Sequence, residues 1–342
     1  MRMEPGGQGA RELGSWGPNA SGARLSRGRA KVYNPPMPAQ VRVYAPGTIG
    51  NVGPGLDILG LAVAGAGDTV QATRTREPGV VIADAGHPSL PCDPARHASG
   101  IAAAEILRGA GVGFGIEIRL TKGLPLSGGQ GGSAASAVAG ALAASLLLDR
   151  PVNSRAVLLA AVEAETRVAG RHADNVAPCL LGGLVLVRTM EPIEVVKLPV
   201  PPSLRVVLAH PDRSMSTREG RAALPREVSL AVALHQAAQV GAIVAAAHSG
   251  DLALLGRAID DRIAEPARAP MLEGFVEAKR AALAAGALGC SISGSGPTVF
   301  AIVSGETNGA RVADAMRQAY AGLGIPCRAR VASADLKGAR AL

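Results

Sequence analysis

Apolar residues recur along the chain with two different spacings, which predict two kinds of element. Short runs that are apolar, or that alternate between apolar and polar side chains, are typical of strands, and they lie at 41–44, 80–82, 116–120, 184–187, 204–209, 298–303 and 327–331. Longer segments rich in Ala and Leu predict helices, and they lie at about 97–109, 133–148, 154–169, 228–249, 251–263, 271–286 and 307–322. Because strands and helices interleave without a regular βαβ period, the pattern predicts an α+β fold with two domains.

A cluster of prolines marks the expected boundary between the two domains. Between residues 190 and 203 the helical and strand periods are interrupted, and a change of this kind is typical of a linker. The prolines are Pro192, Pro199, Pro201 and Pro202. We therefore expect an N-terminal domain over 40–198 and a C-terminal domain over 199–342.

The composition of the 342 residues excludes several classes of protein. Hydrophobic residues make up 48% of the chain, which is incompatible with disorder throughout. The most apolar stretch, 134–148, is shorter than the roughly 20 residues that a bilayer requires, so it predicts a buried helix and no membrane span. The cysteines are far apart and form no Cys-x-x-Cys pair, which disfavours zinc sites and disulfides and favours a cytoplasmic protein. They are Cys92, Cys179, Cys290 and Cys327.

Half of the formal net charge of +8 belongs to residues 1–39, which hold six basic and two acidic side chains. This segment is rich in Gly, Pro, Ser and Arg and lacks the apolar core of a signal peptide, so it predicts a disordered leader with Met37 as the native start. The other 303 residues carry 29 basic and 25 acidic side chains, without a basic run and with few aromatic residues. The sequence therefore does not support a nucleic-acid groove.

A glycine-rich segment between a predicted strand and a predicted helix is the first candidate for chemistry. Residues 125–133 read Pro-Leu-Ser-Gly-Gly-Gln-Gly-Gly-Ser. Glycines before a helix bring backbone N–H groups and the positive end of the helix dipole together, an arrangement that binds phosphate. The alternative is a flexible turn with Ser133 as a helix N-cap. No lysine follows the glycines, which excludes a Walker P-loop.

Two further segments are informative when they are considered together with this loop. Residues 51–57 (Asn-Val-Gly-Pro-Gly-Leu-Asp) form a tight turn with an amide and a carboxylate, and residues 291–298 (Ser-Ile-Ser-Gly-Ser-Gly-Pro-Thr) form a second Gly/Ser loop. The three segments match, in order and separation, the motifs of the GHMP small-molecule kinases, and the chain resembles that family from about residue 41 to 335. Residues 172–178 (His-Ala-Asp-Asn-Val-Ala-Pro) resemble the branch that phosphorylates L-homoserine.

The resemblance implies a two-domain GHMP kinase fold with ATP between the domains. The N-terminal domain is expected to be like the second domain of ribosomal protein S5, and the C-terminal domain to be ferredoxin-like. The implied enzyme is cytoplasmic, requires Mg²⁺, and transfers the γ-phosphate of ATP to the hydroxyl of L-homoserine in threonine biosynthesis. The residues expected to bind ATP are Pro125, Leu126, Ser127, Gly128, Gly129, Gln130, Gly131, Gly132, Ser133, Ala134 and Ala135.

In this family a serine of the phosphate loop and a glutamate of a following helix hold Mg²⁺, and Ser133 matches the serine. Two glutamates, Glu163 and Glu165, are available. Glu165 continues an apolar face of the predicted helix at i, i+3, i+4, i+7 spacing, which directs it to the interior. Glu163 lies on the opposite side with Arg167 at i+4, where a solvated ion pair explains it. We expect Ser133 and Glu165 to be the metal ligands.

The substrate is a zwitterion, and the resemblance assigns residues to both of its charges. Asp57 matches the carboxylate that holds the ammonium group, and Asn51 precedes it by the spacing of the motif. Arg221 and Arg268 match the arginines that bind the carboxylate, since a guanidinium can bond it bidentately. Without the resemblance, each arginine would be interpreted as a solvated or ion-paired surface residue. The remaining expected substrate-binding residues are His172, Thr217 and Gly294.

Catalysis is expected to proceed without a dedicated base. Where several GHMP kinases have an aspartate, this chain has Asn175, whose amide can orient the hydroxyl group but cannot take its proton. Positioning and charge neutralisation suit the loose transition state of phosphoryl transfer. Asn175, Glu165 and Arg221 are the expected catalytic residues, whereas Asp174 could accept a proton weakly or have a local structural role.

Two departures from the family pattern and three alternatives remain. The loop has Gly-Gln-Gly-Gly-Ser where relatives have Gly-Leu-Gly-Ser-Ser, and Ile49-Gly50 replaces a Ser-Ala pair before Asn51. The chain could be a GHMP kinase for another small alcohol, or a catalytically silent relative that senses a ligand. A nucleic-acid-binding role would depend on the basic leader alone. The expected partners are the small-molecule substrates, without nucleic acid or membrane, and a homodimer is compatible with the sequence.

Overall fold

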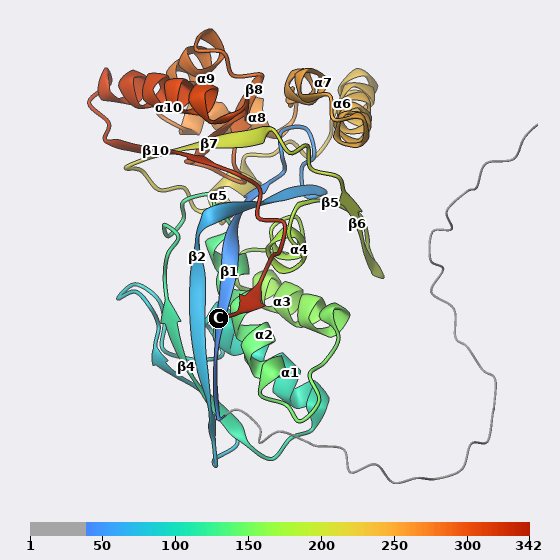
Figure 1. The fold of residues 1–342 in the computed structure, drawn as a ribbon, viewed down its shortest axis with the longest axis vertical. Coiled ribbons are helices and arrows are strands. Elements are labelled where there is room, and N and C mark those ends of the chain that lie inside the picture. Colours follow the sequence, from blue (N-terminus) through green and yellow to red (C-terminus); the bar gives the residue numbers. More distant parts are fainter. Residues whose placement is uncertain (1–38) are drawn as a thin grey trace, which may run out of the picture. The chain divides into compact units, whose positions relative to one another are not determined.

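The computed structural model describes residues 39–342, which fold around two β-sheets (Figure 1). The leader over 1–39 and the start at Met37 lie outside these residues except for residue 39. The first sheet consists of β1 (Gln40–Gly50), β2 (Leu59–Thr75), β3 (Gly79–Asp84), β4 (Gly115–Thr121), β5 (Leu184–Met190), β6 (Ile193–Leu198) and β11 (Arg340–Ala341). Its helices are α1 (Ala98–Ala110), α2 (Gly132–Leu146), α3 (Ser154–Val168) and α4 (Val176–Leu181). We call these elements the first lobe.

The second sheet and the helices around it form the second lobe. Its strands are β7 (Leu204–Pro211), β8 (Gly289–Ile292), β9 (Val299–Ser304) and β10 (Cys327–Ala332). Its helices are α5 (Thr217–Ala222), α6 (Leu230–Ser249), α7 (Leu252–Arg257), α8 (Ala264–Arg268), the 3₁₀ helix η1 (Ala269–Met271), α9 (Phe275–Ala284) and α10 (Glu306–Ala321).

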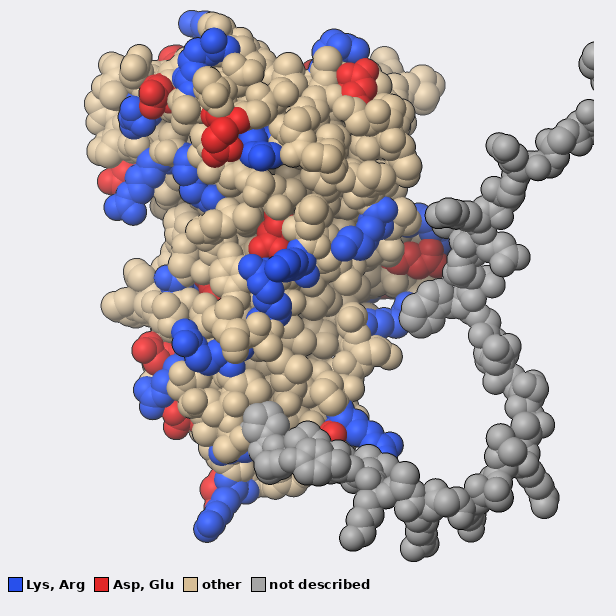
Figure 2. Space-filling view, in the orientation of Figure 1, with Lys and Arg blue, Asp and Glu red and all other residues tan. Residues whose placement is uncertain are grey.

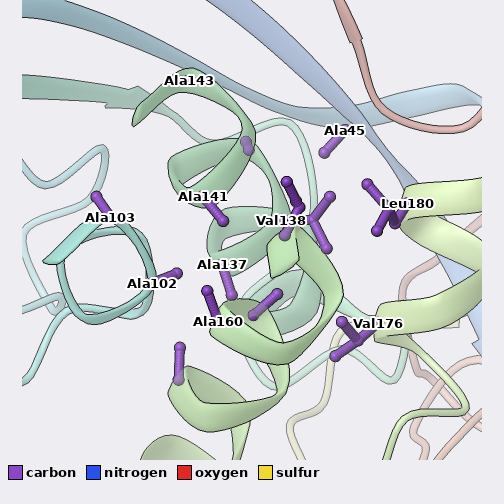
Figure 3. Close-up of a cluster of buried hydrophobic side chains, with 14 of the residues drawn as sticks. Ala45, Ala102, Ala103, Ala137, Val138, Ala141, Ala143, Ala160, Val176 and Leu180 are labelled. Carbon is purple, nitrogen blue, oxygen red and sulfur yellow. The ribbon is translucent and has the colours of Figure 1, made fainter. Parts of the chain in front are cut away.

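The first sheet has the strand order β11-β1-β2-β4-β3, and β5 connects β2 to β6. The 17-residue strand β2 organises it, because its start pairs with β5 and its end with β4. Helices α1 to α4 pack together beside this sheet through small side chains, including Ala102, Ala137 and Ala160 (Figure 3). A Cβ on Gly140 of α2 would lie 2.5 Å from a backbone oxygen of α1. Alanine and glycine thus let helices approach closely in a core with few aromatic rings.

The second sheet has the order β10-β7-β9-β8, all antiparallel, which is the ferredoxin-like arrangement. Alternate residues of its strands point to opposite faces. Val207 and Val299 pack against α9 and α10, whereas Leu208 and Phe300 share a core with α6, α7 and residues of the first sheet. Because this second core includes side chains of both sheets, it joins the two lobes.

The last strand returns to the first sheet. β11 pairs with β1, and Ala334 forms a β-bridge with Val63. The residues from 39 to 342 therefore form a single compact unit in which the chain crosses between the lobes twice. The expected boundary at 198/199 falls where β6 ends, before β7 begins at Leu204, but residues at the end of the chain lie with the first lobe.

Most predicted elements are present, and the differences have local causes. The helix predicted over 251–263 ends at Arg257, because the Asp261 carboxylate accepts the N–H groups of Ile263, Ala264 and Glu265 and starts α8. The helix predicted from 271 begins at Phe275, after Gly274 at φ 80°. Strand β2 was not predicted, because Gly and Ala interrupt its pattern. Strand β6 was not predicted either, because it lies within the proline-rich stretch.

The helix predicted over 133–148 is α2, and it is almost entirely buried, as expected. Among the described residues, the longest apolar helix is α6 and not α2. By length and composition, α6 is apolar enough to cross a membrane. It nevertheless contributes Ile243, Ala246 and Ala247 to the core between the sheets, so it packs as part of the second lobe.

Candidate active site

The three glycine-containing segments converge on one cleft between the lobes, with a volume of about 740 Å³. The phosphate loop and His172 line it from the first lobe, and Arg268 lines it from the second. All of the residues expected to bind substrate lie along it: Asn51, Asp57, His172, Thr217, Arg221, Arg268 and Gly294. Residues that are far apart in the sequence are thus in direct contact. Asn51 Nδ2, for example, donates to the carbonyl oxygen of Gly294, 243 positions away, at 3.1 Å.

The phosphate loop is held from both sides. Thr48 N–H of β1 donates to the Gln130 carbonyl oxygen (3.1 Å), and in the second lobe Ser293 Oγ donates to the Gly129 carbonyl oxygen (2.6 Å). Thr298 Oγ1 donates to the Gly128 carbonyl oxygen. With these carbonyl groups bonded, the loop is fixed where α2 begins, and the N–H groups of the first helical turn, which have no partner in the helix, are available to an anion.

Ser133 is not the N-cap of α2. That position belongs to Gly131, which has φ 67° and no side-chain cap, so the alternative interpretation of Ser133 is excluded. Ser133 lies within the first turn, and its Oγ donates to Glu165 Oε1 at 2.9 Å.

Eight of the eleven residues expected at the ATP phosphates line the cleft. The other three are Gln130, Ala134 and Ala135. Gln130 is buried, and its Nε2 donates to Thr298 Oγ1 (3.2 Å). Ala134 and Ala135 are fully buried in α2, so their side chains belong to the core.

The turn over 51–57 is strained where it enters the cleft. Within the described residues, the positive φ angles outside glycine are those of Asn51 (68°), Val52 (46°), Asp57 (63°) and Ser127 (49°), and all four lie in this turn or in the phosphate loop. Asn51 Oδ1 accepts the N–H of Asp57 at 3.1 Å, and this bond closes the turn. Unfavourable backbone angles persist where surrounding contacts impose them, and they concentrate at functional sites.

The orientation predicted for the two glutamates of α3 is confirmed. Glu165 is 2% exposed, and its Oε2 has no hydrogen-bond partner among the described residues. Burial raises the pKa of Glu165, while Ser133 and the charge of His172 act in the opposite direction. Glu163 is half-exposed and pairs with Arg167 at 2.8 Å. An unpartnered carboxylate oxygen beside a hydroxyl provides the hard oxygen ligands that Mg²⁺ prefers.

Within residues 39–342 no three His, Cys, Asp or Glu side chains cluster as a metal site. Two protein oxygen ligands nevertheless fit a magnesium ion, because Mg²⁺ in kinases takes one or two carboxylates and completes its shell with phosphate and water.

His172, Asp174 and Asn175 form a connected group opposite the loop. Asp174 Oδ2 accepts the N–H of Asn51 (3.0 Å), and its Oδ1 lies 3.1 Å from His172 Nδ1. Burial alone would lower the pKa of His172, but the ion pair with Asp174, with the charges of Glu165 and Asp57 nearby, raises it from 6.5 to about 9. His172 is therefore an imidazolium near neutral pH.

Asn175 is oriented by its neighbours. Its Oδ1 accepts a hydrogen bond from Thr48 Oγ1 at 2.8 Å, and its Nδ2 lies 3.4 Å from Asp174 Oδ2. Gly50 makes this arrangement fit, because a Cβ there would lie 2.5 Å from both Asn175 Nδ2 and Asp174 Oδ2. Glycine at position 50 thus gives room to these two side chains.

The charged groups expected at the substrate pair with one another. Arg221 of α5 donates to both carboxylate oxygens of Asp57, at 2.5 and 2.7 Å. Arg268 is 2% exposed, and it donates to the carbonyl oxygens of Gly220 and Gly294, both at 2.9 Å. Neither arginine is a freely solvated surface residue.

Several residues of the cleft escaped the sequence analysis. Lys122 follows β4, and its Nζ bonds the Gly132 carbonyl oxygen (3.1 Å), Ser136 Oγ (3.3 Å) and the buried Asp68. This ion pair holds the start of α2. The position of Lys122 directly before the glycine-rich loop could have indicated its role from the sequence, whereas no local sequence pattern marks Asp68. At the far end of the cleft, Leu90, Pro91, Arg96 and His97 line the wall, and no motif indicated them.

On the face in Figure 2, Lys and Arg lie in small separate groups, several of them beside Asp or Glu. A cleft with a fixed phosphate loop and paired opposite charges is suited to a small anionic or zwitterionic ligand.

Comparison with family models defines the class of protein. The model of the GHMP kinases N terminal domain matches residues 97–183, and that of the GHMP kinases C terminal matches residues 243–322. The fold is thus that of a GHMP kinase, and the expected N-terminal and C-terminal domains of that family are confirmed.

Relatives narrow the class further. Homoserine kinase from Chlorobium phaeobacteroides (strain DSM 266) is 41% identical over 293 residues, which cover 82% of this chain and 92% of that protein. Homoserine kinase from Arabidopsis thaliana is 39% identical over 315 residues, covering 89% and 85%. The crystal structure of homoserine kinase from Cytophaga hutchinsonii matches with a TM-score of 0.88 and 40% identity, covering 91% of this chain and all of that one. The chain belongs to the homoserine kinase family.

Proposed function

We propose that this protein transfers the γ-phosphate of ATP to the hydroxyl of L-homoserine, giving O-phospho-L-homoserine for threonine biosynthesis. The observation that carries the proposal is that one cleft combines a phosphate loop with Asp57, Arg221 and Arg268, the charges that a zwitterionic amino acid requires. The family relationship supports the same substrate.

The Asp57–Arg221 ion pair suggests how the substrate binds. In the absence of ligand, the Arg221 guanidinium and the Asp57 carboxylate neutralise each other's charge. The substrate ammonium group would replace the guanidinium at Asp57, and its carboxylate would replace Asp57 at Arg221, with Arg268 beside it. Because both partners are half-exposed, the pair itself costs little to open.

ATP would occupy the part of the cleft along the phosphate loop. Its phosphates would accept the N–H groups at the start of α2, and its base would lie toward the apolar wall formed by Leu90 and Pro91. Ser133 and Glu165 would hold Mg²⁺, which when bound neutralises charge on the phosphates.

The hydroxyl of the substrate would be oriented by Asn175. Since Thr48 already donates to Asn175 Oδ1, the amide presents Nδ2 as a donor to the hydroxyl oxygen and leaves a lone pair of that oxygen directed to the γ-phosphate. Asp174 Oδ2 accepts the Asn51 N–H, and its Oδ1 faces the His172 ring at 3.1 Å, which supports a local structural role for it. As the oxygen–phosphorus bond forms, the bond between the γ-phosphorus and the ADP oxygen would break, and the hydroxyl proton would pass to the transferred phosphate. Alignment and electrostatic stabilisation would then supply most of the catalysis.

A coupled assay of ADP release tests the proposal. With Mg²⁺ and ATP, homoserine should stimulate ADP release, whereas mevalonate, shikimate and galactose should not. Stimulation by another alcohol would indicate a different GHMP kinase. Binding of ATP without turnover of any alcohol would indicate a sensor, and both results contradict the proposal.

We further propose a cytoplasmic location and a homodimer. A cytoplasmic location is supported by Cys92, Cys179, Cys290 and Cys327, all of which are free thiols. A homodimer is tested by sedimentation, with a mass near 34.3 kDa contradicting it.

A further inference from the structure

Helix α6 is mostly apolar and largely exposed, yet one polar side chain on it is buried. Gln236 is 7% exposed, although Leu230 and Leu234 on the same helix are 74% and 62% exposed. A buried amide is costly unless its polar atoms are bonded. An apolar residue would also fill this space. Packing alone therefore does not explain why an amide is buried here.

The contacts of Gln236 supply that explanation. Its Nε2 donates to the Pro54 carbonyl oxygen and to Asp261 Oδ1, both at 3.0 Å. Its Oε1 accepts the N–H of Arg262 at 2.9 Å. Three of the four hydrogen bonds that an amide can make are thus formed, and they reach two segments that the sequence separates by about 200 residues.

One of these segments holds the proposed ammonium-binding group. Pro54 lies in the middle of the strained turn over 51–57, which ends at Asp57. Asn51 closes this turn from within, by accepting the Asp57 N–H. From the second lobe, Gln236 holds the middle of the turn at Pro54, while Gly294 and Arg221 contact its two ends at Asn51 and Asp57.

The other segment leads to a proposed carboxylate-binding group. Asp261 Oδ1, which accepts from Gln236, also accepts the N–H groups of Ile263 (2.8 Å) and Ala264 (3.1 Å) at the start of α8. Helix α8 is one short turn, and it ends at the buried Arg268. Arg268 and Asn51 then donate to the same carbonyl oxygen, that of Gly294.

We propose that Gln236 is a positioning residue for the amino-acid substrate: it sets the separation between the turn that ends at Asp57 and the helix that ends at Arg268. This inference rests on the proposed function. The ammonium and carboxylate groups of an α-amino acid share one carbon atom, so the groups that bind them must keep a fixed separation. A displacement of about 1 Å is enough to cost as much as 100-fold in a reaction that depends on alignment.

The test compares Gln236→Met, which keeps length and volume but removes all three hydrogen bonds, with Gln239→Met, a half-buried neighbour on α6. We expect Gln236→Met to raise the KM for homoserine about tenfold or more, to lower kcat less, and to leave the KM for ATP within about twofold. The control should retain wild-type values. A merely structural role would instead change both KM values or only the melting temperature.

A ligand-independent measurement separates this inference from the proposed function. Hydrogen exchange of the free protein should accelerate in residues 51–57 and 262–268 of Gln236→Met, and not in the control. Unchanged exchange in these segments, or an unchanged KM for homoserine in an active variant, overturns the inference. Inactivity of the wild-type protein toward homoserine instead overturns the proposed function, while the exchange measurement still tests the link. If Gln236→Met does not fold, Gln236→Glu serves, since its carboxylate cannot donate to Pro54 and repels Asp261.

Discussion

Asn175 shows at the scale of one residue how the surroundings decide what a side chain can do. Thr48 occupies its carbonyl oxygen, and Gly50 leaves room for its amide nitrogen. The side chain can therefore donate to a substrate hydroxyl, and no proton acceptor is created.

The first prediction concerns this role. Asn175→Ala should lower kcat by about 100-fold, because the nucleophile loses its orientation. Asn175→Asp should not be faster than wild type, since it places a carboxylate about where Nδ2 now lies 3.4 Å from Asp174 Oδ2 and adds negative charge beside the phosphates. Steady-state rates from pH 5 to 9 provide the check. A faster Asn175→Asp enzyme with a new acidic limb would mean that a base assists the reaction.

The second prediction compares the two glutamates of α3. Glu165→Gln should lower kcat by about 100-fold or more and weaken Mg²⁺ dependence, because a buried anion beside Ser133 is lost. Glu163→Gln should stay within about twofold of wild type, as expected for an exposed i, i+4 pair. Magnesium titrations of both variants measure the difference. Equal losses would show that burial does not identify the ligand.

The third prediction concerns the charge on His172. Its pKa is raised from 6.5 to about 9 in the folded protein, so the proton is held more tightly there than in the unfolded chain. The resulting stabilisation is complete below pH 6.5 and is lost as the pH rises to about 9. In EDTA, the free energy of unfolding of wild type minus that of His172→Gln should therefore decrease over this interval, by on the order of 2 kcal/mol. A pH-independent difference would refute the assignment.

At the scale of elements, the start of α2 depends on close approach. Gly131 has φ 67°, and a Cβ there would lie 2.0 Å from Thr48 Oγ1. Thr48 donates to Asn175 Oδ1, so crowding at the helix start reaches the side chain proposed to orient the substrate hydroxyl through one hydrogen bond.

The fourth prediction follows from this contact. Gly131→Ala should destabilise the protein by about 1–3 kcal/mol and lower kcat, because it strains the backbone and displaces Thr48. Gly109→Ala is the control: it lies within α1 with no atom within 4 Å of the added methyl group, and it should be neutral or slightly stabilising. Urea unfolding together with steady-state kinetics measures both effects. A fully active Gly131→Ala enzyme would contradict the proposed coupling.

Helix α3 illustrates what a sequence can predict at this scale. The buried positions Leu158, Ala161, Val162 and Glu165 repeat with the period of the helix, so the interior position of the carboxylate was evident before the fold was known. Gln236 had no comparable signal. Its partners lie 182 and 25 positions away, and an amide on an apolar helix does not reveal which backbone it will meet. The local periodicity of a helix can be predicted from the sequence, whereas contacts between distant segments cannot.

At the scale of the whole molecule, the proposed substrate site depends on both lobes. Asp57 belongs to the first lobe, and Arg221 and Arg268 belong to the second. The resemblance to the GHMP kinases, which assigned all three to the substrate, predicted that these residues would meet. The network that holds them, including Lys122 with Asp68 and Asp261 with α8, became evident only in three dimensions.

The fifth prediction tests the contribution of the second lobe. Arg221→Ala and Arg268→Ala should raise the KM for homoserine, because truncating one side of a charge-assisted pair costs about 2–5 kcal/mol. The effect of Arg221→Ala should be the smaller, since this side chain is half-exposed. Arg213→Ala, which breaks an exposed pair with Glu273, is the control. Kinetics with each substrate varied should show little change in the KM for ATP, and a comparable rise for ATP would argue against the assignment.

The return of the chain to the first sheet has a consequence for synthesis on the ribosome. Asp335 N–H donates to the Ala62 carbonyl oxygen, and Gly183 N–H donates to that of Asp335. Asp335 leaves the exit tunnel only after the entire second lobe has been made. A nascent first lobe must therefore wait with an unpaired sheet edge, which favours chaperone engagement during translation. A premature stop codon that spares every residue of the cleft would still deprive the finished protein of its last strand.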